Sequence, residues 1–349
     1  MAGVALTLGT LLLVGSAATP LWALVALTAL MGAVSTFHGS AFDASYTSLV
    51  PRERLPRANG MMQTVWSLAG LVGPAAAALL IGVPANRDKL AVRAPRLKWI
   101  HATSAGIDGV LPLDWLPRGM AFTNNSGAHG HKTEQYMVMA YNLLNSHMPA
   151  IMANQYQHRW EALFSPSITG KTAVIIGLGD LGEAAARAAK KIGLKVIGVR
   201  RSAQKNRHAD KVVSYKQLDK MLPLADFVVL AVPLTAETRG LLNGKRMDLM
   251  KPTAGVINIA RGPVADYRAL ETRLRRGKLG GAVLDVVDPE PLPADASLWT
   301  TPNLIITPHI SCDDGEHYID ISLDLWFENL ERFLAGKALK RRIDPKLGY

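Results

Sequence analysis

Thr172-Ala-Val-Ile-Ile-Gly-Leu-Gly-Asp-Leu-Gly182 is the stretch of sequence that decides the fold. Its apolar residues predict a buried strand that ends in a Gly177-x-Gly179-x-x-Gly182 turn, and residues 183–191 predict a helix. In such a turn the first glycine permits a tight bend, the second lets the backbone approach a pyrophosphate, and the third lets the helix pack on its strand. A second strand is expected at 195–199, so the stretch predicts a dinucleotide site that includes Asp180 and Leu181. A purely structural strand–helix turn is the alternative.

Two guanidinium groups and a hydroxyl follow the second expected strand, in the sequence Arg200-Arg201-Ser202. A site for NAD usually places Asp or Glu there to bond the ribose 2′-hydroxyl, and this sequence has neither. Arginine binds phosphate through paired donors, so these residues suit the 2′-phosphate of NADP. We therefore expect NADP(H) as the cofactor, with NAD as the second option. The alternative is a solvated basic loop that tolerates either dinucleotide.

The chain has a formal net charge of +11, and its basic residues are concentrated in 200–211 and 337–342. Positive charge can indicate nucleic acid or a membrane surface as a partner. No nucleic-acid-binding motif accompanies the two clusters and few aromatic residues interleave them, so we expect no nucleic-acid partner. A phosphate-bearing cofactor explains the first cluster, and the second is expected to be a solvated surface tail.

Cys312 is the single cysteine, so no disulfide can form within the chain, and no Cys/His ligand set for a metal is expected. A packed small residue is the preferred interpretation of this side chain. A reducing compartment suits such a chain, and we expect the catalytic portion to be cytoplasmic.

Residues 1–82 differ in composition from the rest of the chain. Residues 1–42 contain no Asp, Glu, Lys or Arg, and apolar runs occupy 4–18, 21–34 and 61–82. Runs of this kind predict α-helical, membrane-like segments. A signal peptide is disfavoured because the start lacks a basic region and further apolar runs follow. A buried hydrophobic bundle of a soluble domain is the alternative.

Part of this region resembles the major facilitator transporters. The resemblance rests on Ser48-Leu-Val-Pro-Arg-Glu-Arg-Leu-Pro-Arg-Ala-Asn-Gly60 and on Leu71-Val-Gly-Pro74. A transporter needs both of its halves to build a site at the membrane midplane, and this segment is far too short for that. We therefore expect membrane association through 1–82 and no transport.

From residue 83 onward charges return at normal density, and strand and helix patterns alternate. A long helix is expected over 136–157. Short apolar runs are typical of strands that are buried on both faces. They predict strands at 97–102, 172–176, 195–199, 211–213, 227–231, 255–259, 281–286 and 303–306. This alternation predicts the α/β class, with a doubly wound parallel sheet.

The same part of the chain carries an ordered set of motifs: Ser104-Ala-Gly-Ile-Asp108, the glycine turn, Val232-Pro-Leu-Thr235 with Thr238, Asn258-Ile-Ala-Arg-Gly262, Leu284-Asp-Val-Val-Asp-Pro-Glu-Pro-Leu292 and Thr307-Pro-His-Ile-Ser311. Together they resemble the D-isomer-specific 2-hydroxyacid dehydrogenases, most closely the NADP-using glyoxylate/hydroxypyruvate reductase-like members. The resemblance implies a Rossmann-type NAD(P)-binding domain over 134–312. It also implies a flavodoxin-like substrate domain over 83–133 with a C-terminal return at 313–349.

Two departures from the family pattern affect this expectation. The strand–helix repeats that normally begin the substrate domain are missing and the membrane-like segments stand in their place, so the substrate domain is expected to be incomplete. Such a loss would expose a sheet edge. The loop that bears the family's acid normally has an aromatic residue and an acid before its proline, whereas this chain has Val287-Asp288-Pro289.

Reduction of a 2-keto acid needs a hydride donor, a proton donor and a cation for the carboxylate. Arg261 follows a strand at the sheet edge where ligands bind, and its fork can hold a carboxylate and polarise a carbonyl. Histidine titrates near neutral pH, which makes His309 the candidate proton donor, and Glu290 would pair with its imidazolium. The resemblance assigns the family's catalytic Arg, Glu and His to the same three residues. The structural alternatives are a surface ion pair, an exposed loop acid and a loop histidine.

The resemblance implies further roles at single positions. Ala105 and Gly106 would offer backbone N–H groups to the substrate carboxylate, and Asp285 would bond the nicotinamide carboxamide. The cofactor site would also be lined by Val232, Pro233, Thr238 and Ala260. A structural role is expected for His101, His129, His131, Asp108 and Asp266, and a place in the hinge helix for Glu134. The family dimerises through the nucleotide domain, so a homodimer is expected.

The leading hypothesis is an oxidoreductase that reduces a small 2-keto acid, such as glyoxylate or hydroxypyruvate, with NADPH. The alternative from another class is a membrane transporter fragment fused to a nucleotide-binding domain, with little or no turnover.

Overall fold

The computed structural model describes residues 79–349, apart from 85–86, 95, 346 and 349. The described strands form two parallel sheets, one of three strands and one of seven. The three-stranded sheet comprises β1 (Leu79–Ile81), β2 (Trp99–His101) and β3 (Ala121–Thr123). The seven-stranded sheet comprises β4 (Thr172–Ile176), β5 (Lys195–Val199), β6 (Lys211–Val213), β7 (Phe227–Leu230), β8 (Gly255–Asn258), β9 (Gly281–Leu284) and β10 (Leu304–Ile306).

The larger sheet has the strand order β10-β9-β8-β7-β4-β5-β6, and all its neighbouring strands run parallel. Its order reverses beside β4, and this reversal is where ligands bind in open α/β sheets. Alternate residues of each strand face opposite sides, as the two-residue period of a strand requires. In β4, Ala173 and Ile175 belong to one core cluster and Val174 and Ile176 to the other.

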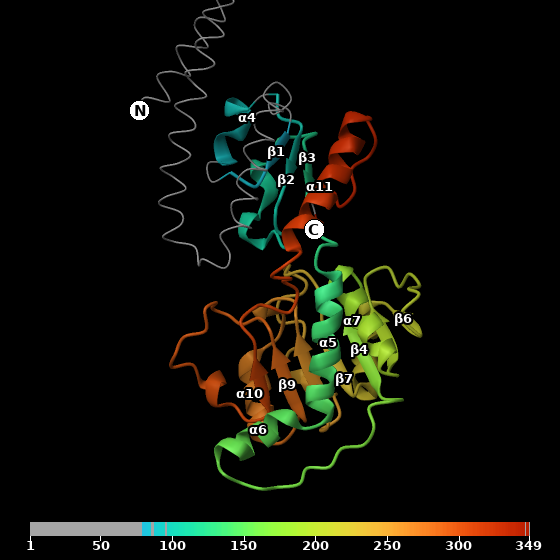
Figure 1. Ribbon diagram of the computed structural model, residues 1–349, viewed down its shortest axis with the longest axis vertical. Helices are drawn as coiled ribbons and strands as arrows, with labels where there is room; N and C mark the ends of the chain where they lie inside the picture. Colours follow the sequence, from blue (N-terminus) through green and yellow to red (C-terminus); the bar gives the residue numbers. More distant parts are fainter. Residues whose placement is uncertain (1–78, 85–86, 95, 346, 349) are drawn as a thin grey trace, which may run out of the picture. The chain divides into compact units, whose positions relative to one another are not determined.

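Helices cover both faces of this sheet. One face is covered by α5 (Gly130–Asn145) and α7 (Asp180–Lys191), which lie side by side (Figure 1) and bury apolar side chains in one shared core cluster. The opposite core cluster contains side chains from α8 (Leu218–Met221), α9 (Gly244–Met247) and α10 (Tyr267–Arg275). The predicted doubly wound sheet is therefore confirmed, and its expected strands appear within a few residues of their predicted bounds.

The expected single helix over 136–157 is wrong. The chain forms α5 and then α6 (Met148–Tyr156), with a break at Ser146 and His147. His147 adopts a left-handed conformation with φ of 53°, which ends the first helix, and Pro149 lies in the first turn of the second. Proline is favoured at that position because its missing N–H would have no helical partner there. Helix α5 also begins earlier than expected, at Gly130.

The smaller sheet has the order β1-β2-β3, with helix α11 (Tyr318–Leu334) packed against it (Figure 1). The indole of Trp99 on β2 lies 6.3 Å from the ring of Trp326 and 5.5 Å from that of Phe333 on α11. A short helix, α4 (Leu90–Arg93), contributes Leu90 to the core of this part. Strand β1 falls within the range 1–82 that the sequence indicates as membrane-like, yet Leu79–Ile81 pairs in register with Trp99–His101.

The C-terminal tail is not the solvated surface tail that its charges predict. Buried Asn329 of α11 binds the tail backbone, accepting from the N–H of Lys340 at 2.8 Å and donating to its carbonyl at 3.0 Å. Arg342 forms an antiparallel bridge with Thr123 at the end of β3, and Ile343 is buried in the core of the smaller sheet. The burial of Ile343 therefore fixes the C-terminal tail on the smaller sheet, although the basic composition of the tail predicts an exposed segment.

Among the described residues, no helix combines the length and the apolar character that a membrane crossing requires. The predicted membrane-like helices and the transporter resemblance lie in residues 1–78, outside the described part of the chain.

Candidate active site

A cleft of about 760 Å³ collects most of the residues that the sequence indicates for chemistry. It is lined by segments from both sheets, by the loop that precedes α11 and by the C-terminal tail. Among the predicted residues it includes Ala105, Gly106, Gly179, Asp180, Leu181, Val232, Pro233, Ala260, Arg261 and His309.

Arg261 enters the cleft from the loop that follows β8. Its Nε donates to Asp108 Oδ2 at 2.9 Å, and its Nη1 donates to the carbonyl of Ala260 at 2.7 Å. A Cβ added at Gly106 would lie only 1.9 Å from Arg261 Nη2, so the guanidinium lies directly against this glycine. Asp108 and Gly106 therefore orient the arginine, a role for Asp108 that the sequence analysis missed. The motif spacing puts Gly106 and Asp108 together but gives no sign of Arg261 as their partner.

His309 and Glu290 form a pair at the cleft. His309 Nδ1 lies 2.8 Å from Glu290 Oε2, and Glu290 Oε1 accepts from the backbone N–H of Val287 at 2.9 Å. Because Nδ1 faces the carboxylate, Nε2 is the ring nitrogen that can give a proton to a molecule in the cleft. Both side chains are a little more than one-third exposed, so a molecule in the cleft can reach them.

Asp285 forms hydrogen bonds to the loop that carries His309. Its carboxylate is buried and accepts three hydrogen bonds from the following loop, from Thr307 Oγ1 at 2.6 Å and from the N–H groups of Ile310 and Ser311 at 2.9 Å. Its carbonyl accepts from the N–H of His309 at 2.8 Å. His309 has a positive φ of 54°, a conformation that is uncommon for residues other than glycine but that His, Asn and Asp adopt more often than the rest. The sequence analysis missed this anchoring role.

Tyr136 extends the anchor to helix α5. Its hydroxyl lies 2.7 Å from Thr307 Oγ1. Since the single hydroxyl proton of Thr307 goes to Asp285, Tyr136 must be the donor in this bond. Burial raises the pKa of Tyr136, so the phenol stays protonated and able to donate at working pH.

The glycine turn has the geometry that its spacing predicts. Gly177 has φ of 98°, and a Cβ there would lie 2.3 Å from the carbonyl oxygen of Ala231. A Cβ at Gly182 would lie 1.8 Å from the carbonyl oxygen of Gly177, so only glycine lets the helix start pack here. A Cβ at Gly179 would meet no atom within 4 Å, which leaves room for a ligand to approach the backbone. These are the three properties that a pyrophosphate-binding turn needs.

A second cavity of about 240 Å³ adjoins the turn. It is lined by Arg200, Arg201 and Ser202, and also by Gly177, Gly179, Val232, Pro233 and Thr238. The sequence analysis missed Glu237, which lines the same cavity and pairs with Arg201 at 3.5 Å. Thr238 Oγ1 donates to the carbonyl of Pro233 at 2.6 Å, which fixes the wall of the cavity. The residues suit a phosphate-bearing nucleoside at the end of β5.

Asp180 has a contact that its place in the glycine turn does not predict. Its Oδ2 accepts from the backbone N–H of Gly127 at 2.9 Å, which joins the first turn of α7 to the loop before α5.

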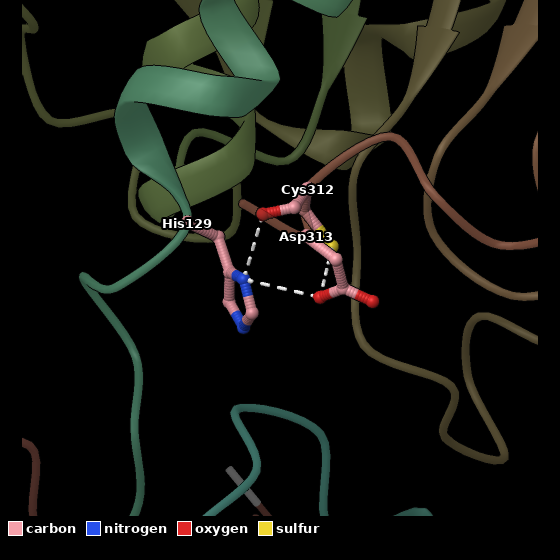
Figure 2. A group of neighbouring side chains, drawn as sticks. All are labelled: His129, Cys312 and Asp313. Carbon is pink, nitrogen blue, oxygen red and sulfur yellow. Dashed lines mark hydrogen bonds and ion pairs between the residues drawn. The ribbon is translucent and has the colours of Figure 1, made fainter. Parts of the chain in front are cut away.

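His129, Cys312 and Asp313 lie close enough together to be examined as a metal site (Figure 2). His129 Nδ1 lies 3.0 Å from the carbonyl oxygen of Cys312 and 3.7 Å from Asp313 Oδ1, so this nitrogen acts as a donor. Burial raises the pKa of the Cys312 thiol to about 12. Because His129 Nδ1 is already bound to a backbone carbonyl, the arrangement of these side chains is explained without a metal ion. The His129 ring also stacks on Tyr318 at 5.1 Å, which supports the expected structural role.

His101 is buried, is absent from the cleft lining and is not a candidate proton donor. Burial lowers its pKa to about 4, so the ring is neutral at working pH, and its Nδ1 lies 2.8 Å from Thr123 Oγ1.

Comparison with known proteins agrees with this geometry. Residues 137–311 match the family model described as D-isomer specific 2-hydroxyacid dehydrogenase, NAD binding domain. A glyoxylate reductase of Pyrococcus furiosus is 32% identical over 253 residues, which cover 70% of this chain and 75% of that protein.

Solved structures give the same result. A D-isomer specific 2-hydroxyacid dehydrogenase from Xanthobacter autotrophicus, in complex with NADPH and MES, superposes with a TM-score of 0.71 at 29% identity, over 78% of this chain and 85% of that one. An NADPH-dependent glyoxylate/hydroxypyruvate reductase from Sinorhizobium meliloti, in complex with NADP and sulfate, gives 0.70 at 29% identity, over 78% and 86% of the two chains. This chain therefore belongs to the D-isomer specific 2-hydroxyacid dehydrogenases and contains their NAD-binding domain.

Proposed function

We propose that this protein reduces a small 2-keto acid, of the size of glyoxylate or hydroxypyruvate, to the D-2-hydroxy acid with NADPH. The observation that carries the proposal is the arrangement at one cleft of Arg261 against Gly106, the His309–Glu290 pair and the open backbone at Gly179. A cation, a proton donor and a dinucleotide turn are the three parts that this reaction needs.

The residues have separate tasks in the reaction. Arg261 binds the substrate carboxylate and polarises the carbonyl, with the backbone N–H groups of Ala105 and Gly106 as further donors. NADPH supplies the hydride to the carbonyl carbon. His309 gives the proton on Nε2 to the carbonyl oxygen, and Glu290 stabilises the imidazolium before the transfer. Hydride and proton together convert the carbonyl group to the alcohol, primary from glyoxylate and secondary from hydroxypyruvate.

The preference for NADPH is assigned to the cavity at Arg200, Arg201 and Ser202. The relatives from Xanthobacter and Sinorhizobium were solved with NADPH and NADP, which supports the same cofactor here. Glu237 offsets part of the positive charge through Arg201, and this pairing leaves NAD as a weaker second cofactor. Val232, Pro233, Thr238 and Ala260 are proposed to complete the cofactor site.

We also propose a homodimer, formed through the nucleotide-binding part. The end of α6 and the segment that follows it present Tyr156, Trp160 and Phe164 to solvent, with exposed fractions of 83%, 101% and 91%. Large aromatic side chains this exposed are typical of a protein–protein contact. We propose a cytoplasmic setting for the catalytic portion, since a reducing compartment suits a chain with a single thiol, and membrane association through 1–82 stays a prediction.

The test is NADPH oxidation by the full-length protein with glyoxylate and hydroxypyruvate, compared with NADH. We expect turnover with NADPH to exceed turnover with NADH, and Arg261→Ala to abolish turnover while NADPH still binds. Arg268→Ala is the matched control, because Arg268 is exposed on α10 away from the cleft lining. A wild-type protein that binds NADPH but reduces no small 2-keto acid would contradict the proposal.

A further inference from the structure

Three arginines line the cleft, and two of them, Arg261 and Arg341, each lie against a glycine from a loop of the smaller sheet. Arg261 lies on Gly106, in the loop after β2, and Arg341 lies on Gly127, in the loop after β3. A Cβ at Gly127 would lie 3.0 Å from Arg341 Nε and 3.1 Å from its Nη2. The first arginine is accounted for by the carboxylate of a 2-keto acid, whereas the second has no task in the reaction described above.

The tail is built to hold Arg341 in the wall of the cleft. Buried Asn329 binds the backbone of the preceding residue, and the N–H of Asn124 donates to the carbonyl of Arg341 at 3.3 Å. On the other side, the buried Ile343 donates its N–H to the carbonyl of Phe122 at 2.8 Å. Arg341 has φ of 55°, so the chain accepts a left-handed backbone at this residue.

The charge around Arg341 favours an anion. Lys340 and Arg341 both pair with Glu328, at 3.5 Å in the case of Arg341, and none of the described acidic groups lies within ion-pair distance of Arg342. Among these three consecutive cations, two therefore share one carboxylate and the third has none within ion-pair distance among the described residues. The other acid at this place is Asp180, whose carboxylate already accepts from the N–H of Gly127.

The remaining acids of the cleft lining have partners of their own. Asp108 pairs with Arg261, Asp313 with His129 and Asp314 with His317. They do not cancel the excess positive charge that Lys340, Arg341 and Arg342 carry.

We propose that Arg341, with Arg342 beside it, forms an anion subsite, so that the preferred substrate is a 2-keto acid that carries a second acidic group, a carboxylate or a phosphate. This inference rests on the proposed function, since it assigns the far end of the same substrate. Arg261 binds the carboxylate next to the reacting carbonyl, and Arg341 binds the second acid.

The experiment compares substrates that differ only in the second acid. Pyruvate is paired with oxaloacetate, and hydroxypyruvate with 3-phosphohydroxypyruvate, so that the two pairs separate a carboxylate from a phosphate. The variant is Arg341→Asn, because asparagine accepts a positive φ and the tail can keep its fold. Lys337→Asn is the control, an exposed basic residue of the same tail that is absent from the cleft lining.

In the wild type we expect kcat/KM to be higher for the doubly acidic member of at least one pair. Arg341→Asn should reduce that advantage by about 10- to 100-fold, the usual effect of one charge-assisted hydrogen bond, and leave kcat/KM for pyruvate unchanged. The affinity for NADPH should also stay the same. An equal loss of NADPH affinity would assign Arg341 to the cofactor pyrophosphate and overturn the inference, as would an unchanged ratio.

A binding measurement separates this inference from the proposed function. Titration calorimetry with NADP⁺ present compares D-malate with D-lactate, which lacks the second carboxylate, and 3-phosphoglycerate with glycerate, which lacks the phosphate. A tighter acidic member in the wild type, lost in Arg341→Asn, supports the subsite even if no 2-keto acid is reduced, a result that would count against the proposed function alone. Equal affinities in both pairs overturn the subsite while turnover of glyoxylate leaves the proposed function standing.

Discussion

The two sheets contribute to the cleft in different ways. In the seven-stranded sheet the functional residues directly follow strands: Gly177 follows β4, Arg200 follows β5 and Arg261 comes soon after β8. The smaller sheet contributes loops and a tail that come from distant parts of the chain, such as Gly106 and Arg341. The difference teaches that the seven-stranded sheet brings its site residues together through strand order, whereas the smaller sheet also depends on a distant tail that packs back against it. Substitutions at site residues of the seven-stranded sheet should therefore remove a reacting group. Substitutions in the smaller sheet should instead move a reacting group out of position.

The largest effect is expected from loss of His309, the proposed proton donor. His309→Ala should lower kcat by about 10²- to 10⁴-fold, because general acid catalysis contributes this much, while the Kd for NADPH stays near the wild-type value. Stopped-flow reduction of glyoxylate and fluorescence titration of NADPH measure the two quantities. His131→Ala is the control, since His131 is exposed and absent from the cleft lining. If His309→Ala kept the full kcat, His309 would not be the proton donor, and the comparison between the two sheets would fail.

Gly106→Ala tests whether the smaller sheet misplaces chemistry without supplying it. The new Cβ would lie 1.9 Å from Arg261 Nη2, so the guanidinium must move. A misplacement of about 1 Å can cost about 100-fold in rate, and we expect a loss of this size in kcat/KM for glyoxylate. Gly109→Ala is the matched control, because a Cβ there would meet no atom within 4 Å. Equal activity of the two variants would show that Gly106 does not position Arg261.

Acid should destabilise the smaller sheet through His101. Its folded pKa of about 4 lies below the ordinary value of 6.5, so the unfolded chain binds the proton more readily. The free energy of unfolding should fall as pH drops from about 6.5 to about 4, by at most about 3 kcal/mol, and stay level above that window. His101→Asn, which does not titrate, should flatten this dependence in urea unfolding series.

The control for that series is His131→Asn, which exchanges an exposed histidine. It should leave the acid-side slope as steep as in the wild type. A slope that is unchanged in His101→Asn would place the acid sensitivity outside the smaller sheet.

The smallest effect is expected at Tyr136, whose hydroxyl donates to Thr307 behind Asp285. Tyr136→Phe removes one hydrogen bond and leaves Thr307 bound to the carboxylate, so the free energy of unfolding should fall by about 1 kcal/mol. Because α5 also packs on α7, the packing of the ring itself should be kept. Tyr156→Phe, an exposed tyrosine on α6, is the control and should have no effect. If kcat fell together with the free energy of unfolding, the hydrogen bond of Tyr136 would also be needed to position His309.

The larger sheet could be predicted from the sequence because its strands are continuous apolar runs and its turn carries three glycines with distinct steric tasks. Gly177 and Gly182 are forced by the backbone, since a Cβ at either would clash with a carbonyl oxygen. The residue types of Arg261, Glu290 and His309 were likewise recognisable from motifs. The break at His147 was overlooked, although Pro149 inside the expected helix is a local signal for it.

The tail and the anchors could not be predicted for a different reason. Arg341 and Arg342 look like a solvated basic cluster in sequence, and only the burial of Ile343 and the two bonds from Asn329 reveal that they are fixed in the cleft wall. Asp108 looks structural until Arg261 is placed against it. Contacts between residues this far apart in the chain leave no local periodicity to detect.

The left-handed backbone of His309 sets stability against function at a single residue. A residue other than glycine adopts this conformation at a cost of about 1 to 2 kcal/mol, which the bonds to Asp285 must offset. Replacement by glycine would relieve the strain while it removes the imidazole, so His309→Gly should be more stable than His309→Ala and equally inactive. A search for heat-resistant variants of this protein would therefore select glycine at His309, a substitution that is expected to end catalysis.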